Sequence, residues 1–225
     1  MEFLFKDKNC VIIYKPPGLP SQSDKSGDAD ALTLTSSALK EAGEPSELYL
    51  IHRLDRVVGG LLVFARNKRS AAELSRLVCG EGIGKEYLAV IDSRLEGGTL
   101  RDFIYKDSRL SKAFVVERSR AGVKEAELDF STLASQSTEK GERSLVKIKL
   151  KTGRFHQIRV QFASRGAPIS GDGKYGSRDN GAKMPALFAY RLSFELFGKK
   201  ISAERLPDLS EYPWSLFDKE KYGEL

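Results

Sequence analysis

Short apolar runs, several of them alternating with polar residues, recur along most of this sequence. Alternation with a period of two is typical of strands with one buried face, and short unbroken apolar runs are typical of buried strands. The pattern predicts strands at Val11–Tyr14, Leu48–Ile51, Leu61–Ala65, Tyr87–Ile91, Ala126–Leu133, Leu145–Leu150 and Leu187–Leu196. Gly198 and the two lysines after it separate the last run from ISAERL, so we also predict a hairpin there.

Helical periodicity is limited to two segments. Ser70 and Glu73 fit a capping box, and Gly80 supplies a C-terminal stop. The sequence therefore predicts a helix over Ser70–Cys79. Residues 155–165 fit a helix, but their IRVQF stretch alternates and fits a strand as well.

Polar segments separate these elements. Residues 21–47 are rich in Ser, Asp, Gly, Glu and Lys, which predicts a loop with at most a short helix at Ala38–Ala42. Residues 136–143 are typical of a polar hairpin tip. We see no internal repeat and no linker, so we expect one domain over residues 1–225. Many strands and few helices predict an α+β fold around a large, mixed but mostly antiparallel sheet.

Composition narrows the function classes. The chain has 225 residues, 37 Lys plus Arg against 31 Asp plus Glu, and a formal net charge of +6. This excess permits a polyanionic partner without requiring one. Two cysteines and two histidines disfavour a Cys/His zinc site and a disulfide framework. No apolar run is long enough to span a membrane and the N-terminus lacks a signal-peptide pattern, so we expect a cytosolic protein.

The first candidate site is IHRLDRVVGG, residues 51–60, between two predicted strands. Here Asp55 is flanked by Arg53 and Arg56, and nearby cations favour an ionised carboxylate. A carboxylate nucleophile requires that form. The alternative is a surface loop of ordinary ion pairs that ends in a Gly-Gly turn.

The second candidate site is LKTGRFHQIRVQFASRGAPISGDGKYG, residues 150–176. Arg154 and Arg159 lie near a potential helix start, a placement that suits recognition of phosphate or carboxylate groups. The alternative is a solvated basic helix.

Taken together, these stretches resemble the RluA-type pseudouridine synthases. HRLDRVVGGLLVFARN is similar to the catalytic signature of that family, and TGRFHQIRVQFASRGAPISGDGKYG to its second long motif. YKPPGLPSQ, GKEYLAVI and ALFAYRLSF add shorter matches in the expected order, so the resemblance covers about residues 10 to 196. Ordered motifs of this length are far more specific than one short pattern.

The resemblance implies an isomerase that converts uridine in ribosomal or transfer RNA to pseudouridine without cofactor or metal. It implies the pseudouridine-synthase fold, with a catalytic cleft across the sheet and no room before Tyr14 for an S4-type RNA-binding module. Asp55 takes the position of the nucleophile that adds covalently to the base or the ribose. Family members of this size commonly act alone, so we expect a monomer.

The other site residues follow from the same resemblance. Arg159 falls where an arginine pairs with the nucleophile, and Tyr87 where a tyrosine lies against the uracil. Arg53 would fill the space left by the flipped base, and Ile158 would form an apolar wall. His52 is expected at the substrate as a residue that orients the loop, and His156 in a similar orienting role.

RNA contacts outside the centre are expected from cations that flank the motifs. These are Lys15, Arg56, Arg66, Lys68, Arg69, Arg101, Lys112, Lys174 and Arg178. Asp172 is expected to cap or tie its own loop. The chain departs from the commoner family letters at Val58, Gly59, Phe155 and Gln161, which leaves the target RNA open.

Two other functions remain open from the sequence. A non-catalytic RNA-binding protein would use the same basic residues. A glycoside hydrolase would use Asp55 with an acid such as Glu86, but Glu86 precedes Tyr87 on a strand and so faces the opposite side.

Overall fold

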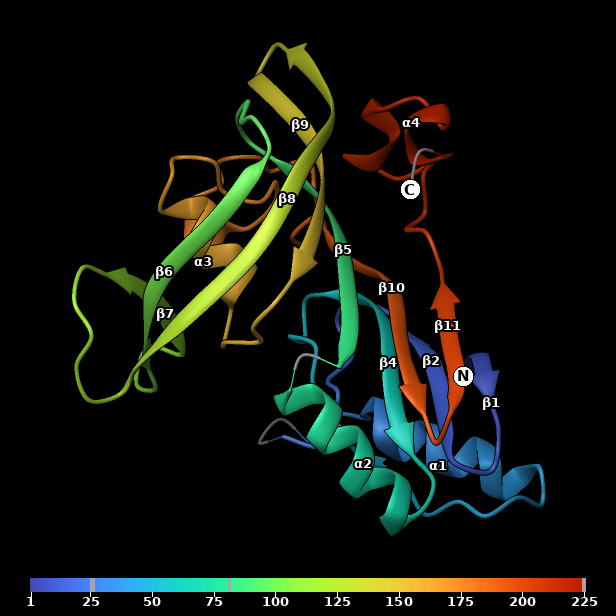
Figure 1. Cartoon of the computed structure of the whole chain (residues 1–225). Helices are drawn as coiled ribbons and strands as arrows, with labels where there is room; N and C mark the ends of the chain where they lie inside the picture. Colours follow the sequence, from blue (N-terminus) through green and yellow to red (C-terminus); the bar gives the residue numbers. More distant parts are fainter. Residues whose placement is uncertain (25–26, 81, 224–225) are drawn as a thin grey trace. The chain divides into compact units, whose positions relative to one another are not determined.

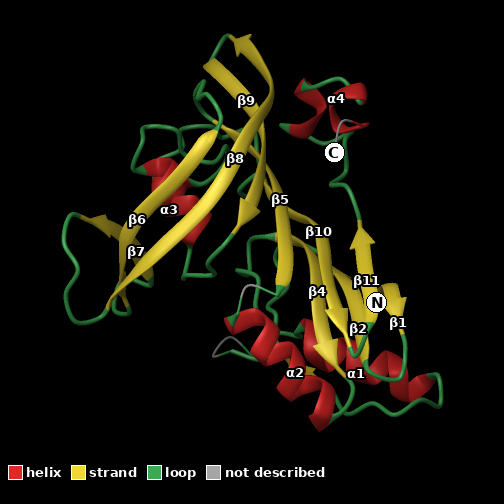
Figure 2. Cartoon of the chain, in the orientation of Figure 1, coloured by secondary structure: helices red, strands yellow, loops and turns green. Residues whose placement is uncertain are grey.

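The computed structural model describes residues 1–24, 27–80 and 82–223 (Figure 1). The chain forms two compact units. Unit 1 comprises Met1–Lys85 and Ala189–Pro207, and unit 2 comprises Glu86–Phe188 and Asp208–Leu225. The prediction of a single domain over residues 1–225 stays a prediction. Figure 2 shows that strands dominate the structure and that helices are few, which confirms the α+β class.

Unit 1 is built on a sheet with the strand order β1-β2-β4-β10, in which β2 pairs antiparallel with β1 and β4, β11 with β10, and β3 with β4. The strands are β1 (Glu2–Lys6), β2 (Cys10–Lys15), β3 (Tyr49–Leu50), β4 (Gly59–Ala65), β10 (Leu187–Leu196) and β11 (Lys199–Glu204). All of β4 is buried, and its residues pack with β2, β10 and α2 in one apolar cluster. The predicted hairpin at Gly198 is confirmed.

Helix α1 (Ala31–Glu41) corrects the prediction of a loop with a short helix at Ala38–Ala42. Asp30 caps its start by accepting a hydrogen bond from the Thr33 amide at 2.9 Å. The buried residues Ala31, Thr35 and Leu39 recur every four positions. Packing of this narrow buried face stabilises the helix, although the segment as a whole is too polar for the sequence pattern to predict it.

Helix α2 (Lys68–Cys79) begins before the predicted Ser70. Its N-cap is Asn67, whose side chain accepts a hydrogen bond from the Ser70 amide at 2.8 Å. Glu73 pairs with Arg76 instead of closing a capping box. The predicted end at Gly80 is confirmed.

Unit 2 contains a second array with the strand order β5-β9-β8-β6-β7, in which β9, β8, β6 and β7 pair antiparallel. Its strands are β5 (Ile83–Ile91), β6 (Gly98–Asp107), β7 (Lys112–Val116), β8 (Val123–Thr138) and β9 (Gly141–Leu150), and the boundary between units falls inside β5 and β10. The polar hairpin tip is confirmed but is shorter than predicted, because β8 and β9 extend into it.

Helix α3 (Gln157–Ala163) resolves the ambiguity over residues 155–165 in favour of a helix. Val160 packs with Ile104, Ala113 and Ala126, so α3 covers apolar residues of β6, β7 and β8. The remaining elements are the short 3-10 helices Gly173–Tyr175 and Trp214–Leu216 and α4 (Glu220–Gly223). Within the three described ranges, no helix is long and apolar enough to cross a membrane.

Candidate active site

Asp55 lies in the loop that joins β3 to β4, and the backbone of this loop is held from several sides. The Ser21 hydroxyl donates to the Leu54 carbonyl at 2.9 Å and accepts from the Leu54 amide at 3.0 Å. The Asp55 carbonyl accepts from the Val58 amide at 3.0 Å. Leu54 and Val58 are both buried, so the carboxylate of Asp55 projects from a loop that is fixed before any ligand arrives.

Lys15 ties this loop to the segment after β2. Its ammonium donates to the carbonyls of Pro16 at 3.1 Å, Leu19 at 2.7 Å and Arg56 at 3.3 Å. The side chain is 0% exposed. Burial lowers the pKa of Lys15 to about 8, and the negative charge of Asp55 opposes that shift. Lys15 is therefore a buried support of the Asp55 loop, which corrects its predicted role in contacting RNA.

The basic residues of the loop differ in their surroundings. Arg53 is exposed. Arg56 donates to the Gly18 carbonyl at 3.0 Å and pairs with Asp28. His52 is largely buried and its Nε2 accepts from the Val63 amide at 3.5 Å. Burial, with a smaller contribution from the charge of Lys85, lowers the pKa of His52 to about 3, so its imidazole is neutral at physiological pH.

A glycine is required where the loop enters β4. Gly60 has a φ of +127°, and a Cβ placed there would lie 2.4 Å from the Ala189 carbonyl oxygen on β10. No other residue fits this close approach of two strands. The Gly-Gly step of the sequence motif thus brings the end of the Asp55 loop directly against β10.

In unit 2, the start of α3 is organised by one glutamine. Gln157 Oε1 accepts from the Arg154 amide at 3.0 Å and from the Thr152 hydroxyl at 2.8 Å, while its Nε2 donates to the Glu127 carbonyl at 3.1 Å. His156, just before the helix, has a φ of +52°. The Tyr175 hydroxyl is hydrogen-bonded to His156 Nδ1 at 2.8 Å, so His156 is tied to the loop that follows α3.

Arg159 projects from α3 into a buried ion pair with Asp172. Its Nε donates to Oδ2 at 2.6 Å and its Nη2 to Oδ1 at 2.9 Å. Arg159 is 4% exposed and Asp172 is 1% exposed, and the guanidinium lies 5.1 Å from the centre of the Tyr175 ring. A bidentate pair fixes both the position and the orientation of the guanidinium plane. Asp172 thus ties its loop to α3 and makes no side-chain capping bond to the short helix after it.

Tyr87 and Ile158 are both buried, on β5 and α3 respectively. Glu86 lies 3.9 Å from the ammonium of Lys147 on β9. This pairing adds to the strand alternation as an argument against Glu86 as the acid of a glycoside hydrolase. The predicted meeting of Tyr87, Ile158 and Arg159 with Asp55 joins residues of different units and stays a prediction.

The residues that depart from the family letters have defined partners. Phe155 stacks on His156 with ring centres 3.8 Å apart, and the Lys106 ammonium lies 4.6 Å from its ring. Gln161 Nε2 donates to Asp102 at 2.7 Å. Nearby, Arg154 is exposed and its Nε donates to the Glu125 carbonyl at 2.7 Å.

Arg66 corrects another predicted RNA contact. Its side chain is only 7% exposed and donates to the Asp7 carbonyl at 2.8 Å and to Glu44 at 2.9 Å. Sequence reasoning also missed Ser21 and the pairing of Asp172 with Arg159. Asp172 stands within a motif that was noted, but the sequence carries no signal for a partner 13 positions away. Among the residues that the structure describes, no cluster of three or more His, Cys, Asp or Glu is placed to hold a metal ion.

Comparison with known proteins assigns most of the chain to one family model. Residues 9–164 match the model described as RNA pseudouridylate synthase. This range contains both the Asp55 loop and α3.

Several curated proteins are similar over most of this chain. An uncharacterised RNA pseudouridine synthase of Bacillus subtilis, YhcT, is 31% identical over 85% of this chain and 63% of its own length. An uncharacterised RNA pseudouridine synthase of Haemophilus influenzae is 30% identical over 94% of this chain and 90% of its own length. Ribosomal large subunit pseudouridine synthase D of Borreliella burgdorferi is 28% identical over 93% and 64%. The chain thus spans less than two thirds of the first and third of these relatives.

Two solved structures have the same fold. Human RNA Pseudouridylate Synthase Domain Containing 4 has a TM-score of 0.75 and 24% identity, covering 92% of this chain and 89% of that one. Human RNA Pseudouridylate Synthase Domain Containing 1 has a TM-score of 0.76 and 22% identity, covering 92% of this chain and 83% of that one. The predicted pseudouridine-synthase fold is therefore confirmed.

Proposed function

Because the chain belongs to the RNA pseudouridylate synthase family, we propose that it isomerises uridine in RNA to pseudouridine with Asp55 as the nucleophile. The Asp55 carboxylate adds to the substrate, the bond between the base nitrogen and the ribose breaks, and the base is rejoined through carbon. That carbon then loses a proton, the base nitrogen freed from the ribose gains one, and the bond to Asp55 breaks so that its carboxylate is regenerated.

The observation that carries the proposal is the rigidity of the Asp55 loop within the family match. Ser21 holds the backbone next to Asp55, and the buried Lys15 holds the carbonyl after it. A nucleophile must be positioned to a fraction of an ångström before reaction, because small displacements cost large factors in rate. An ordinary surface ion-pair loop needs no such support.

We assign Arg159 as the cation that stabilises the ionised nucleophile during reaction. Its orientation by Asp172 supports this role, because a guanidinium that is already fixed loses little entropy on pairing. Tyr87 is assigned to the uracil and to the final proton removal, and Ile158 to the apolar wall of the base pocket.

Arg53 is assigned to the space vacated by the flipped uridine, and its exposure supports this role. Arg154 is assigned to a phosphate of the bound RNA, since it is exposed beside the start of α3. His52 stabilises the loop as a neutral hydrogen-bond acceptor.

The proposed substrate is ribosomal or transfer RNA in the cytoplasm, with the protein acting as a monomer. The names of several relatives, which specify the large ribosomal subunit, favour ribosomal RNA. Mapping pseudouridine in total RNA from cells with and without the gene would identify the site. If no site is lost in ribosomal or transfer RNA, the proposal is wrong.

A transcript of the RNA identified in this way allows a direct test of Asp55 as the nucleophile. Asp55→Asn should bind the unmodified transcript but form no pseudouridine, whereas Asp218→Asn, an exposed aspartate in unit 2, should leave turnover unchanged. Turnover by Asp55→Asn would remove this residue from the nucleophile role. A chain whose cellular effect survives this substitution would instead be a non-catalytic RNA-binding protein.

A further inference from the structure

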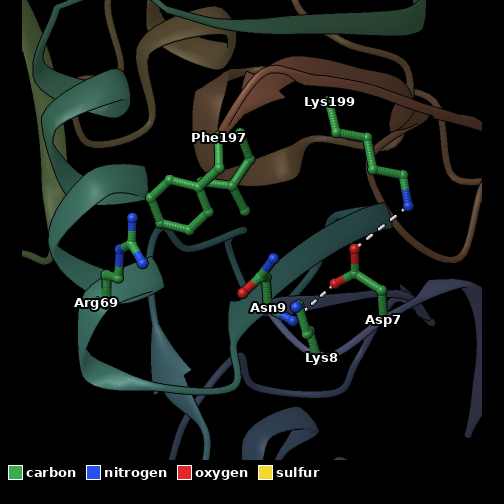
Figure 3. Close-up of a pocket in the computed structure, with 7 residues that line it drawn as sticks. Asp7, Lys8, Asn9, Arg69, Phe197 and Lys199 are labelled. Carbon is green, nitrogen blue, oxygen red and sulfur yellow. Dashed lines mark hydrogen bonds and ion pairs between the residues drawn. The ribbon is translucent and has the colours of Figure 1, made fainter.

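Unit 1 has a pocket of about 620 Å³ that involves none of the residues assigned to catalysis. It lies between the β1–β2 turn, the first turn of α2 and the β10–β11 turn, and Figure 3 shows the side chains of Asp7, Lys8, Asn9, Arg69, Phe197 and Lys199 around it. Its volume falls in the range of about 300 to 1,000 Å³ that is typical of ligand sites.

The pocket is cationic. Lys8, Arg69 and Lys199 are exposed, and Asp7 is the one acid among the lining residues. The carboxylate of Asp7 is already engaged, because Oδ1 accepts from the amides of Asn9 at 2.8 Å and Cys10 at 3.0 Å, and Oδ2 lies 3.4 Å from the Lys199 ammonium. Two positive charges therefore remain for an anion.

The start of α2 adds to this excess. The helix begins with Lys68 and Arg69 and has no acidic residue in its first turn. Cations at the N-terminus of a helix oppose the positive end of the helix dipole, so this arrangement destabilises the free protein. A bound phosphate would relieve the repulsion.

Phe197 gives the pocket an aromatic surface. Its side chain is 44% exposed, and the Arg69 guanidinium lies 4.6 Å from the ring centre. Phe197 has a φ of +51° and Gly198 a φ of +79°, a turn in which Asn-Gly is the favoured pair. The exposed aromatic ring thus stands at a position where a small polar residue would be more stable.

We propose that this pocket binds a nucleotide of the substrate RNA distinct from the reacting uridine, with a phosphate on Arg69 and Lys8 and a base stacked on Phe197. The proposal rests on the proposed function. Arginine and aromatic side chains together suit single-stranded RNA, because every base has a face that can stack.

The strand β2 sets the spacing between the two sites. Its 6 residues run from Cys10, beside the pocket, to Lys15, which holds the Asp55 loop. At about 3.3 Å per step between residues this is about 17 Å. The pocket thus lies one strand length away from the Lys15 side chain that holds the Asp55 loop.

Binding of a labelled, unmodified large-subunit ribosomal RNA fragment, measured by fluorescence anisotropy over a range of salt concentrations, tests the proposal. Arg69→Ala should reduce the salt dependence of binding by about one phosphate contact. Phe197→Asn should weaken binding about fivefold or more, the size of one lost stacking contact, while thermal stability stays equal or rises. Arg76→Ala on the same helix makes the same change in charge and should bind like the native chain.

The outcomes separate the two proposals. If Arg69→Ala and Phe197→Asn bind and react like Arg76→Ala while the native chain forms pseudouridine, the pocket proposal is wrong and the proposed function stands. If the native chain neither binds RNA nor forms pseudouridine, both are refuted. Saturable binding of uridine monophosphate that Arg69→Ala abolishes, with RNA binding unchanged, would assign the pocket to a free nucleotide instead. If the pocket proposal is right, Arg69→Ala and Phe197→Asn should each raise the KM for the RNA and leave kcat unchanged.

Discussion

Methionine has a side chain of similar length to lysine but carries no charge. Replacing Lys15 by methionine therefore removes a buried charge from beneath the Asp55 loop. The ammonium is the one partner described for the Leu19 carbonyl, whereas the Arg56 carbonyl also accepts from the Gly18 amide. Losing the charge leaves a carbonyl unpaired but ends the cost of burying an ion. These terms oppose each other, and such replacements are often nearly neutral in stability. At pH 7 we expect the free energy of unfolding to change by less than about 2 kcal/mol.

The dependence of that difference on pH is larger. The pKa of Lys15 falls from 10.5 in the unfolded chain to about 8 in the folded protein, chiefly through burial. Between these values the unfolded chain holds a proton that the folded protein has released, so stability rises with pH. At 1.36 kcal/mol for each pH unit, the native protein gains about 3 kcal/mol across this window. The methionine variant has no such gain.

Urea denaturation of both proteins at intervals from pH 7 to pH 10.5 measures the effect. Burial raises the pKa of the Cys10 thiol to about 12, which adds an opposite slope above pH 9. This slope is common to both proteins and cancels in their difference. Lys200→Met, which removes an exposed lysine on β11, is the control.

Activity separates a positioning role from a structural one. With the loop less constrained, Lys15→Met should form pseudouridine about 100-fold more slowly, as expected for a nucleophile displaced by about 1 Å, while RNA affinity is retained. Parallel stability curves for the native protein and Lys15→Met would refute the burial argument. Unchanged turnover would refute the positioning role.

Three further substitutions test other parts of the structure, each by denaturation at pH 7. Asp172→Ala leaves the Arg159 guanidinium buried without its bidentate partner and should lower the free energy of unfolding by about 3 to 5 kcal/mol. A decrease below about 1 kcal/mol, or unchanged formation of pseudouridine, would contradict the role assigned to this pair. Gly60→Ala places a Cβ 2.4 Å from the Ala189 carbonyl oxygen and should yield little folded protein, so a stable variant would show that β4 and β10 can separate there. Asp30→Ala removes the cap of α1 and should cost about 1 kcal/mol, whereas Asp30→Asn should restore most of it.

The strands with strong alternation could be predicted from the sequence because burial dictates their pattern. The strands β1, β6 and β7 were missed, since charged residues interrupt β6 and the apolar runs of β1 and β7, FLF and AFVV, are short. Most of helix α1 was missed for a related reason: its three buried positions are Ala, Thr and Leu, and only the last is strongly apolar.

The residues of the candidate site came from motif resemblance, but their support did not. Lys15 was expected on the surface because lysine usually is, and only the folded chain shows three carbonyls converging on its ammonium. The pairing of Asp172 with Arg159 likewise depends on how the loop after α3 returns to the helix. Contacts of this kind are set by tertiary structure and leave no local signal.

The buried imidazole of His52 adds no pH-dependent charge to the Asp55 loop over the physiological range. An exposed histidine gains a proton as the pH falls from 8 toward 5 and adds to the attraction for phosphate. The pKa of His52 is about 3, and arginines keep their protons throughout this interval. The loop therefore presents the charge of the exposed Arg53 under mildly acidic as under neutral conditions. Its attraction for a polyanion therefore stays constant, whereas a loop rich in exposed histidines would bind a polyanion more tightly as the pH falls.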